Sequence, residues 1–239
     1  MNYKSVIFAS ALFVGSGLAV GGYFIGNTLY KSKISLNTAT VKGLAERQVS
    51  ADQAVWTIGF SVACALKDEV PDLYRKAEND RTRIIDCLKA GGILPDEIAT
   101  GPINYSKTEY RNDDKELVDE KHELYGNVTI YTSRVEAIKP ARARMDSLII
   151  EGINVQNQAP NYLFTRLNEI KPSMLEEATR NARTAAAEFA KNAGVKVGKI
   201  RSATQGGFSV VDAGEDYGDK QSIRKEVRVV TTVEFYLTD

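Results

Sequence analysis

Residues 54–63 read Ala-Val-Trp-Thr-Ile-Gly-Phe-Ser-Val-Ala, and this alternation decides the fold class. Bulky apolar side chains stand at every second position, at Trp56, Ile58 and Phe60, with smaller residues between them. A period of two residues is typical of a β-strand that buries one of its faces. The stretch therefore predicts a strand whose bulky face packs on a core.

A helix is predicted directly after this strand. Asp68 is a candidate N-cap, and Gly91-Gly92 ends the apolar pattern, as glycine does at helix C-termini. The apolar residues that recur on one helical face are Leu73, Ala77, Ile84 and Leu88.

Two further helices are predicted downstream. The first runs from about Pro140 to Ile150 and is expected to bury Met145, Leu148 and Ile149. The second follows a capping-box pattern at 173–176 (Ser-Met-Leu-Glu) and ends at Gly194. Its stripe is rich in alanine, which predicts a close approach of helix to sheet: Leu175, Ala178, Ala182, Ala185, Ala186, Phe189 and Ala193.

Each predicted helix ends in glycine followed by an apolar residue, at Gly92-Ile93, Gly152-Ile153 and Gly194-Val195. Repeated helix-then-strand units would give this pattern, and so would ordinary helix C-caps.

Alternation predicts further strands, with polar loops at 111–116 and 212–221. The predicted strands cover residues 98–110, 124–131, 162–167, 199–210 and 227–237. The order β-α-β-β-α-β-α-β-β predicts an α+β domain with helices packed on a largely antiparallel sheet. We assign this domain to residues 34–239, with 34–40 as a polar linker.

An uncharged run of 26 residues, Ser5 to Tyr30, precedes the domain. As a helix it would extend about 39 Å, enough to cross a hydrocarbon core of about 30 Å. We interpret residues 1–33 as a transmembrane signal anchor. A cleaved signal peptide is the alternative, which the length of the run and the lack of an Ala-x-Ala site disfavour. Lys4 on one side and Lys31 with Lys33 on the other leave the orientation undecided by charge.

Two GxxxG matches lie inside this segment. Small residues at such spacing let two membrane helices approach closely, so these glycines are candidates for self-association. Glycine is also common in membrane helices without any such role. The candidate residues are Gly17, Gly21, Gly22 and Gly26.

Charge and cysteine content exclude several classes of function. The chain has 31 basic and 31 acidic residues, and three of the basic ones flank the apolar segment, so the domain carries 28 − 31 = −3. Such a domain is a poor match for nucleic acid. Two cysteines are too few for a disulfide scaffold or a four-ligand metal site. About 28 Å of helix separates Asp68 from Cys87, so we expect Cys64 and Cys87 to stay unbridged.

The sequence carries no catalytic or cofactor motif. His122 is the single histidine, and its polar surroundings predict a solvent-exposed position at a strand edge. The acidic run at 214–219 lacks the alternating spacing of a calcium loop. We therefore expect no enzymatic activity, no cofactor and no metal.

Tyrosine is frequent, at 11 residues, and several fall in predicted strands. Sheet packing explains this content, but tyrosine is also favoured in interfaces. Tyr125 and Tyr131 are therefore candidates for a surface that recognises a peptide or another subunit.

Three stretches together resemble the SIMPL-domain family of bacterial proteins. The first is Val41-Lys-Gly-Leu-Ala-Glu-Arg47 with its continuation to Trp56. The second is the alanine-rich helix ending at Gly194, followed by Gln205-Gly-Gly-Phe208, and the third is the final strand from Val227. The resemblance covers residues 38–239. It implies a periplasmic α+β domain that self-assembles, in a family whose members are named for oxidative-stress defence or as periplasmic immunogens. It supplies no catalytic residues, and the uncleaved anchor departs from it.

The 42–47 segment also has a structural interpretation as a turn, in which Gly43 permits a bulge and Glu46, with Arg47, can pair across strands.

These observations lead to one expected function and one main alternative. We expect a non-enzymatic protein in the bacterial inner membrane, single-pass, with its C-terminal domain in the periplasm. It would self-assemble as a homo-oligomer and support the envelope, including in oxidative-stress defence. The alternative is a peptide- or small-ligand-binding module. A hydrolase built on Asp and Glu residues has no supporting spacing in the sequence.

Overall fold

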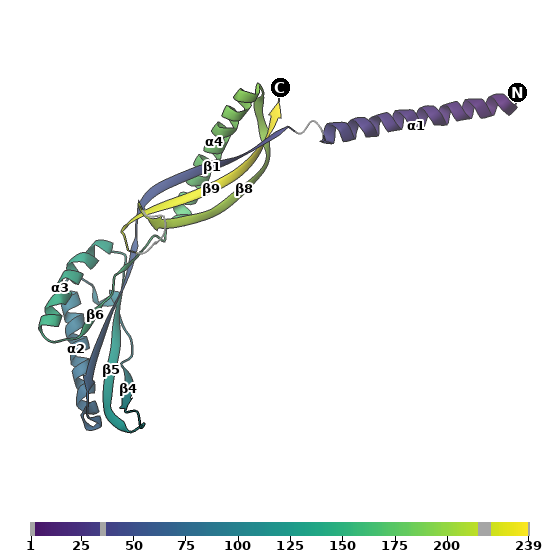
Figure 1. Ribbon diagram of the computed structural model, residues 1–239. Coiled ribbons are helices and arrows are strands. Elements are labelled where there is room, and N and C mark those ends of the chain that lie inside the picture. Colours follow the sequence, from purple (N-terminus) through teal and green to yellow (C-terminus); the bar gives the residue numbers. More distant parts are fainter. Residues whose placement is uncertain (1–2, 34–36, 215–220, 239) are drawn as a thin grey trace. The chain divides into compact units, whose positions relative to one another are not determined.

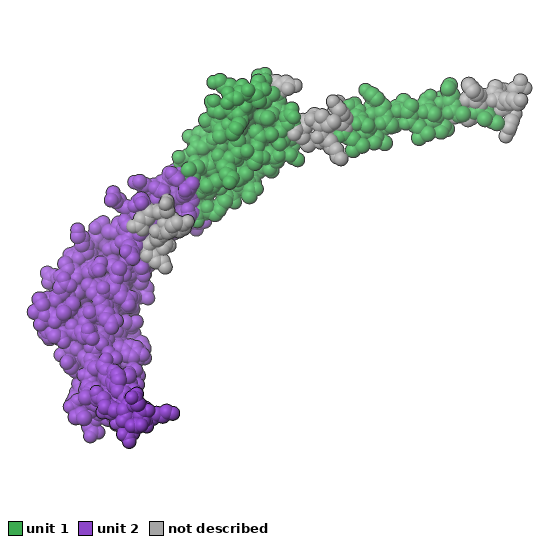
Figure 2. All heavy atoms as spheres, in the orientation of Figure 1, with its two compact units in different colours: residues 1–45, 173–208, 229–239 green, residues 46–172, 209–228 purple. Residues whose placement is uncertain are grey.

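The structure is a computed structural model that describes residues 3–33, 37–214 and 221–238 (Figure 1). The chain forms two compact units (Figure 2). Unit 1 comprises residues 1–45, 173–208 and 229–239, and unit 2 comprises residues 46–172 and 209–228. The acidic run at 215–219 lies outside the described residues, as does the 34–36 part of the predicted linker.

The N-terminal helix α1 spans Tyr3–Lys33, as the sequence predicts. Its segment Ala11–Leu29 has a mean hydropathy of 1.3 and is long and apolar enough to cross a membrane, although a signal sequence has the same properties. Two polar side chains inside it bond back to the helix: Ser16 donates to the carbonyl of Leu12 at 2.7 Å and Thr28 to that of Phe24 at 2.8 Å. These bonds satisfy the hydroxyl groups without water, as a hydrocarbon environment requires.

Unit 2 is built on a six-stranded antiparallel sheet with helices α2 and α3. Its strands are β2 (Gln53–Cys64), β3 (Ile98–Thr100), β4 (Asn104–Arg111), β5 (Leu117–Thr132), β6 (Val155–Asn157) and β7 (Asn161–Leu163). Helix α2 (Val70–Ala90) follows β2, and α3 (Ile138–Ile150) follows β5. Short 3-10 turns, η1 (Lys67–Glu69), η2 (Pro95–Glu97) and η3 (Val135–Ala137), precede α2, β3 and α3.

The strand order β3-β5-β2-β6 gives unit 2 a recognisable topology. Two β-α-β halves, β2-α2-β3 and β5-α3-β6, interleave so that each short third strand pairs with the long strand of the other half. This is the β-α-β-β-α-β arrangement of ferredoxin-like folds. Strand β4 pairs with β5 beyond the end of β3. The predicted α+β class with a largely antiparallel sheet is confirmed.

The core of unit 2 lies where β2 and β5 face the helices. Trp56, Ile58 and Phe60 on β2 are at most 2% exposed, and Val128 and Ile130 on β5 are fully buried. The two strands pair from Ala54↔Thr132 to Cys64↔His122. The helical contribution includes Leu73, Ala77, Ile84, Leu88, Met145 and Leu148. The decisive strand and the predicted face of α2 are therefore confirmed.

Unit 1 contains a three-stranded sheet and helix α4 (Leu167–Ala193), whose first residues belong to unit 2. The strand order is β1-β9-β8, with β1 at Thr38–Ser50, β8 at Lys196–Asp212 and β9 at Arg224–Thr238. The core consists of Val41, Ala182, Ala186, Val233 and Phe235. Both C-terminal strands are longer than predicted. Strand β1 was not predicted from the sequence.

Gly43 lies where β1 and α4 meet. A Cβ atom at this position would overlap the carbonyl oxygen of Ala178 and would lie 2.8 Å from the Cβ of Ala182. The alanine-rich helix therefore approaches the strand closely, as predicted. Gly43 lies inside β1, and its lack of a side chain makes room for the helix backbone. Glu46 pairs across strands: its carboxylate on β1 lies 3.4 Å from Nε of Arg228 on β9.

Three details of α4 differ from prediction. The helix begins at Leu167, so the 173–176 pattern lies inside it and is not a capping box. Its buried face is spaced strictly by four residues, at Met174, Ala178, Ala182, Ala186 and Ala190. Phe189, at 65% exposed, and Ala193 lie off this face.

Other boundaries in unit 2 also differ. Asp68 lies in η1 and does not cap α2, which begins at Val70 without a side-chain cap. Ile149 is 53% exposed, because Met145 and Leu148 already occupy the inner face of α3. The strand predicted over 98–110 is interrupted at Gly101, whose N–H bonds to Asn127 O at 3.1 Å. The strand predicted over 162–167 ends at Leu163, and Asp52 accepts the N–H groups of 165 and 166 in the turn that follows.

The three helix-ending glycines share one local structure. Gly92, Gly152 and Gly194 have φ of 94°, 81° and 70°. The residue after each donates to a carbonyl five positions back, for example Ile93 to Leu88 at 3.1 Å. This is the Schellman motif, so the C-cap interpretation of the repeated pattern is confirmed.

A buried ion pair in unit 2 joins the end of β8 to the start of β9. The ammonium of Lys225 donates to the carboxylate of Asp212, and the two side chains are 0% and 4% exposed. Asp212 also accepts the backbone N–H groups of Gln221 and Ser222 at 3.0 and 3.1 Å. Burial alone would raise the pKa of Asp212, but these hydrogen bonds outweigh it and lower that pKa.

Candidate functional site

Tyr125 and Tyr131 come together on one face of the unit 2 sheet. They lie six residues apart on β5, so their side chains point to the same side, opposite to the buried Val128 and Ile130. Helices α2 and α3 cover the other side (Figure 1). The two rings are 47% and 52% exposed. The structure thus places both predicted interaction residues on an open sheet surface.

Most residues around the two rings are uncharged, although Glu123 lies next to Tyr125 on the same side of β5. In register, Tyr131 lies opposite Val55 and Tyr125 opposite Ser61. We call this surface the tyrosine face; its residues are Val55, Thr57, Gly59, Ser61, Tyr125, Asn127, Thr129 and Tyr131. It offers aromatic rings with hydrogen-bonding tips, a combination suited to binding and not to proton transfer.

The four candidate glycines lie on α1. A Cβ atom at any of them would meet nothing within 4 Å. At 100° per residue, the Gly17/Gly21 pair and the Gly22/Gly26 pair point about 140° apart around the helix. The two GxxxG patterns therefore form two separate faces, and a helix pair would use one of them.

The expectation of an exposed His122 is wrong. Its side chain is fully buried, because β5 runs between β2 and β4 and is not an edge strand here. Nδ1 lies 2.7 Å from the hydroxyl of Tyr105, and Nε2 lies 2.9 Å from Glu120 Oε1. Lys107 bonds the other oxygen of Glu120 at 2.8 Å, and that bond is the main reason that the pKa of Glu120 is lowered. The polar sequence of 117–123 hid this extension of the strand.

Both cysteines are free thiols, as predicted. Cys64 lies opposite His122 in the β2–β5 register and donates to the carbonyl of Leu66 at 3.3 Å. Cys87 donates to the carbonyl of Arg144 at 3.6 Å, and burial raises the pKa of its thiol. A thiol with a raised pKa is a poor nucleophile at neutral pH.

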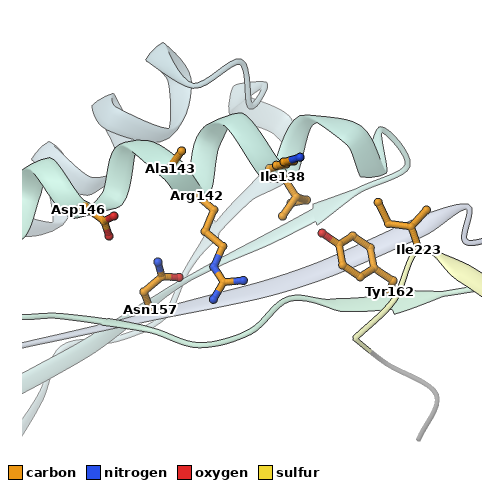
Figure 3. Close-up of a pocket in the computed structure, with 8 residues that line it drawn as sticks. Ile138, Arg142, Ala143, Asp146, Asn157, Tyr162 and Ile223 are labelled. Carbon is orange, nitrogen blue, oxygen red and sulfur yellow. The ribbon is translucent and has the colours of Figure 1, made fainter. Parts of the chain in front are cut away.

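A cavity of about 450 Å³ lies between α3 and the short strands β6 and β7 (Figure 3). The Arg142 side chain reaches across it from α3, and its guanidinium lies between Asn157 and the Tyr162 hydroxyl in this view. The cavity is lined by Ile138, Lys139, Arg142, Ala143, Asp146, Asn157, Tyr162 and Ile223. None of these residues was a candidate from the sequence. Asn157 and Tyr162 reach the cavity because β6 and β7 both pair with β2, and no local sequence pattern predicts that pairing.

Two lining residues are held in place by the core. The indole N–H of Trp56 donates to Asn157 Oδ1 at 3.2 Å and to the carbonyl of Gln158 at 3.0 Å. The Tyr162 ring is 8% exposed within the core cluster. Burial raises the pKa of Tyr162, so its hydroxyl stays protonated and able to donate.

Across residues 3–33, 37–214 and 221–238, no three His, Cys, Asp or Glu side chains gather in a way that would hold a metal ion. The tyrosine face and the Arg142 cavity both carry groups suited to binding.

Comparison with known proteins gave one family. The family model named SIMPL, described as a protein of unknown function (DUF541), matches residues 39–235. The search of curated proteins found no match.

Proposed function

The chain belongs to the SIMPL family, and on this premise we propose that it is a non-enzymatic, membrane-anchored envelope protein that self-assembles. In this proposal α1 is a single-pass anchor in the bacterial inner membrane and the SIMPL domain lies in the periplasm. Its partners are the membrane and other copies of the chain, and it supports the envelope, including under oxidative stress. The length and hydropathy of Ala11–Leu29 support the anchor.

The free edge of β8 is the observation that carries the assembly proposal. Among the described strands, β8 pairs with β9 alone, so its other edge presents backbone N–H and C=O groups along a 17-residue strand. All residues from 199 to 205 are exposed. A long exposed edge is a template for a strand from another chain.

Charge on this edge is partly neutralised within the sheet. Arg201 pairs with Glu234 on β9 at 2.8 Å, and Ser202 donates to the same carboxylate at 3.1 Å. Ile200, between Lys199 and Arg201, is 45% exposed. The edge therefore combines an apolar side chain with a reduced charge barrier against a second copy.

The oligomeric state tests the proposal. Protein extracted in mild detergent, with and without residues 1–33, should be measured by light scattering coupled to gel filtration. A discrete oligomer that survives removal of the anchor supports assembly through the domain. Monomers in both forms would refute it.

A matched pair of substitutions then locates the contact. Ile200→Lys places a charge on the β8 edge and should dissociate the oligomer. Ile150→Lys makes the same change at an 87%-exposed position on α3 and should leave it intact. Equal oligomers from both variants would exclude the β8 edge as the contact.

The tyrosine face favours a second candidate, a peptide- or small-ligand-binding module. Its two exposed rings, among mostly uncharged residues, suit an extended, weakly charged ligand. The double variant Tyr125→Ala and Tyr131→Ala should lose binding to peptides selected on the wild type. Tyr74→Ala, at a 48%-exposed tyrosine on α2, is the control. Unchanged binding by the double variant would remove this candidate.

A further inference from the structure

The Arg142 cavity combines cationic groups with an apolar wall. Arg142 and Lys139 both line it, and within the described ranges neither side chain has an ion-pair partner. Asp146 is the one acidic residue in the lining, one helical turn beyond Arg142. The guanidinium lies toward Asn157 and Tyr162 instead of toward this carboxylate (Figure 3). The positive charge of Arg142 is therefore available to an incoming group.

Polar groups lie on both sides of the guanidinium in Figure 3. Oδ1 of Asn157, which accepts from the Trp56 indole, lies on the Arg142 side of its amide. The hydroxyl of Tyr162 points toward the guanidinium (Figure 3), and the charge of Arg142 acts on it electrostatically. Arginine presents several N–H donors in a planar fork that matches carboxylate and phosphate oxygens. The Arg142 guanidinium, with the Tyr162 hydroxyl beside it, thus supplies the donors for an anion at this position.

The remaining wall is apolar. Ile138 is fully buried at the start of α3, and Ile223 packs beside Tyr162 at the edge of the unit 2 core. A volume of about 450 Å³ is in the range of small-molecule sites. The wall would cover the hydrocarbon part of a ligand whose charged end meets Arg142.

We propose that this cavity binds a small organic anion, with its carboxylate or phosphate on the Arg142 guanidinium and its apolar part against Ile223. The site lies wholly within unit 2 and does not depend on self-assembly. It is also separate from the tyrosine face, which is formed by the opposite side of the β2–β5 sheet.

The test is a titration of the full chain in non-ionic detergent with phenylacetate, phenyl phosphate and the neutral isostere phenylacetamide. Isothermal calorimetry should give saturable binding of at least one anion and at least tenfold weaker binding of the amide. The anion that binds more tightly identifies the preferred headgroup. Absence of saturable binding by both anions, or equal binding of the amide, would overturn the proposal.

Three variants assign the binding to this cavity. Arg142→Gln should lower the affinity about 10- to 100-fold, since a hydrogen bond to a charged group is lost. Tyr162→Phe keeps the packed ring and should lower the affinity about two- to tenfold. Arg144→Gln makes the same charge change on α3 outside the cavity and should bind as the wild type does. Wild-type affinity in Arg142→Gln would refute the site even if the probes bind elsewhere, for example in the detergent.

Discussion

Glu97 is the centre of a hydrogen-bond cluster in unit 2, and its removal should destabilise that unit in a pH-dependent way. Its Oε1 accepts from the Thr132 hydroxyl at 2.6 Å and from Arg134 Nε at 3.1 Å. Its Oε2 accepts from Arg134 Nη2 at 2.6 Å and from the backbone N–H of Leu94 at 2.9 Å. Arg134 also donates to the carbonyl of Gly92 at 2.9 Å, so the cluster joins the end of β5 to the turn after α2.

The magnitude follows from the pKa of the carboxyl. The hydrogen bonds from Arg134, which outweigh the effect of burial, lower the pKa of Glu97 from 4.5 to about 2. A difference of about 2.5 units corresponds to about 3.4 kcal/mol at neutral pH. The Glu97 side chain is 11% exposed, but Arg134 is 45% exposed, so solvent screening reduces the contribution. We expect Glu97→Gln to cost about 2 kcal/mol at pH 7.

The sign with pH is set by the lowered pKa. Because the folded carboxyl titrates below the unfolded one, its contribution is complete above about pH 4.5 and is lost as the pH falls toward 2. The stability difference between wild type and Glu97→Gln should therefore shrink by more than half between pH 7 and pH 3. Other carboxyl groups titrate in both proteins and cancel in this difference.

Urea unfolding followed by tryptophan fluorescence is the assay. Trp56 is the single tryptophan of the chain and is fully buried in unit 2, so its emission reports on the unit that contains Glu97. Glu136→Gln, at an exposed position of the same unit, should match the wild type at both pH values. Equal stability of Glu97→Gln and wild type at pH 7, or a pH-independent difference, would refute the reasoning.

Three further predictions concern packing and buried polar groups. Gly43→Ala should destabilise unit 1 by about 1–3 kcal/mol in thermal unfolding followed by circular dichroism, because its Cβ overlaps helix backbone, whereas Gly207→Ala, with open space, should be neutral. Asp212→Asn should cost about 3–5 kcal/mol by the fluorescence assay, because it removes the carboxylate that faces the buried ammonium of Lys225; a cost below 1 kcal/mol would contradict this. His122→Leu should cost about 1–3 kcal/mol by the same assay, since two buried hydrogen bonds are lost; a stable variant would show that they contribute nothing.

Strong periodicity made part of the fold predictable. Strand β2 alternates bulky and small residues, and β9 does so with valines, so both were assigned from sequence. Strand β1 was not predicted, because its buried positions, Val41, Gly43 and Ala45, carry small side chains that leave room for α4. A strand that faces a close helix thus lacks the bulky signal on which periodicity depends.

The candidate sites also differ in whether the sequence alone could predict them. Tyr125 and Tyr131 were predictable as a pair, because an even spacing on a strand places two residues on one face whatever the sheet topology. The Arg142 cavity was not, since Asn157 and Tyr162 reach it only through tertiary pairing of β6 and β7 with β2. His122 was misplaced because a polar run concealed the length of β5.

The division of the chain between its units has a consequence for biosynthesis. The sheet of unit 2 comes from the continuous stretch 53–163, whereas β1 in unit 1 must wait for its neighbour β9, which begins at Arg224. At about 5–20 residues per second, the ribosome needs roughly 3 to 13 s to add the residues from 173 to 238. During that delay the residues of the ferredoxin-like sheet are already present, while β1 is without its partner strand. A truncation before β9 leaves β1 without the strand that it pairs with in the complete sheet.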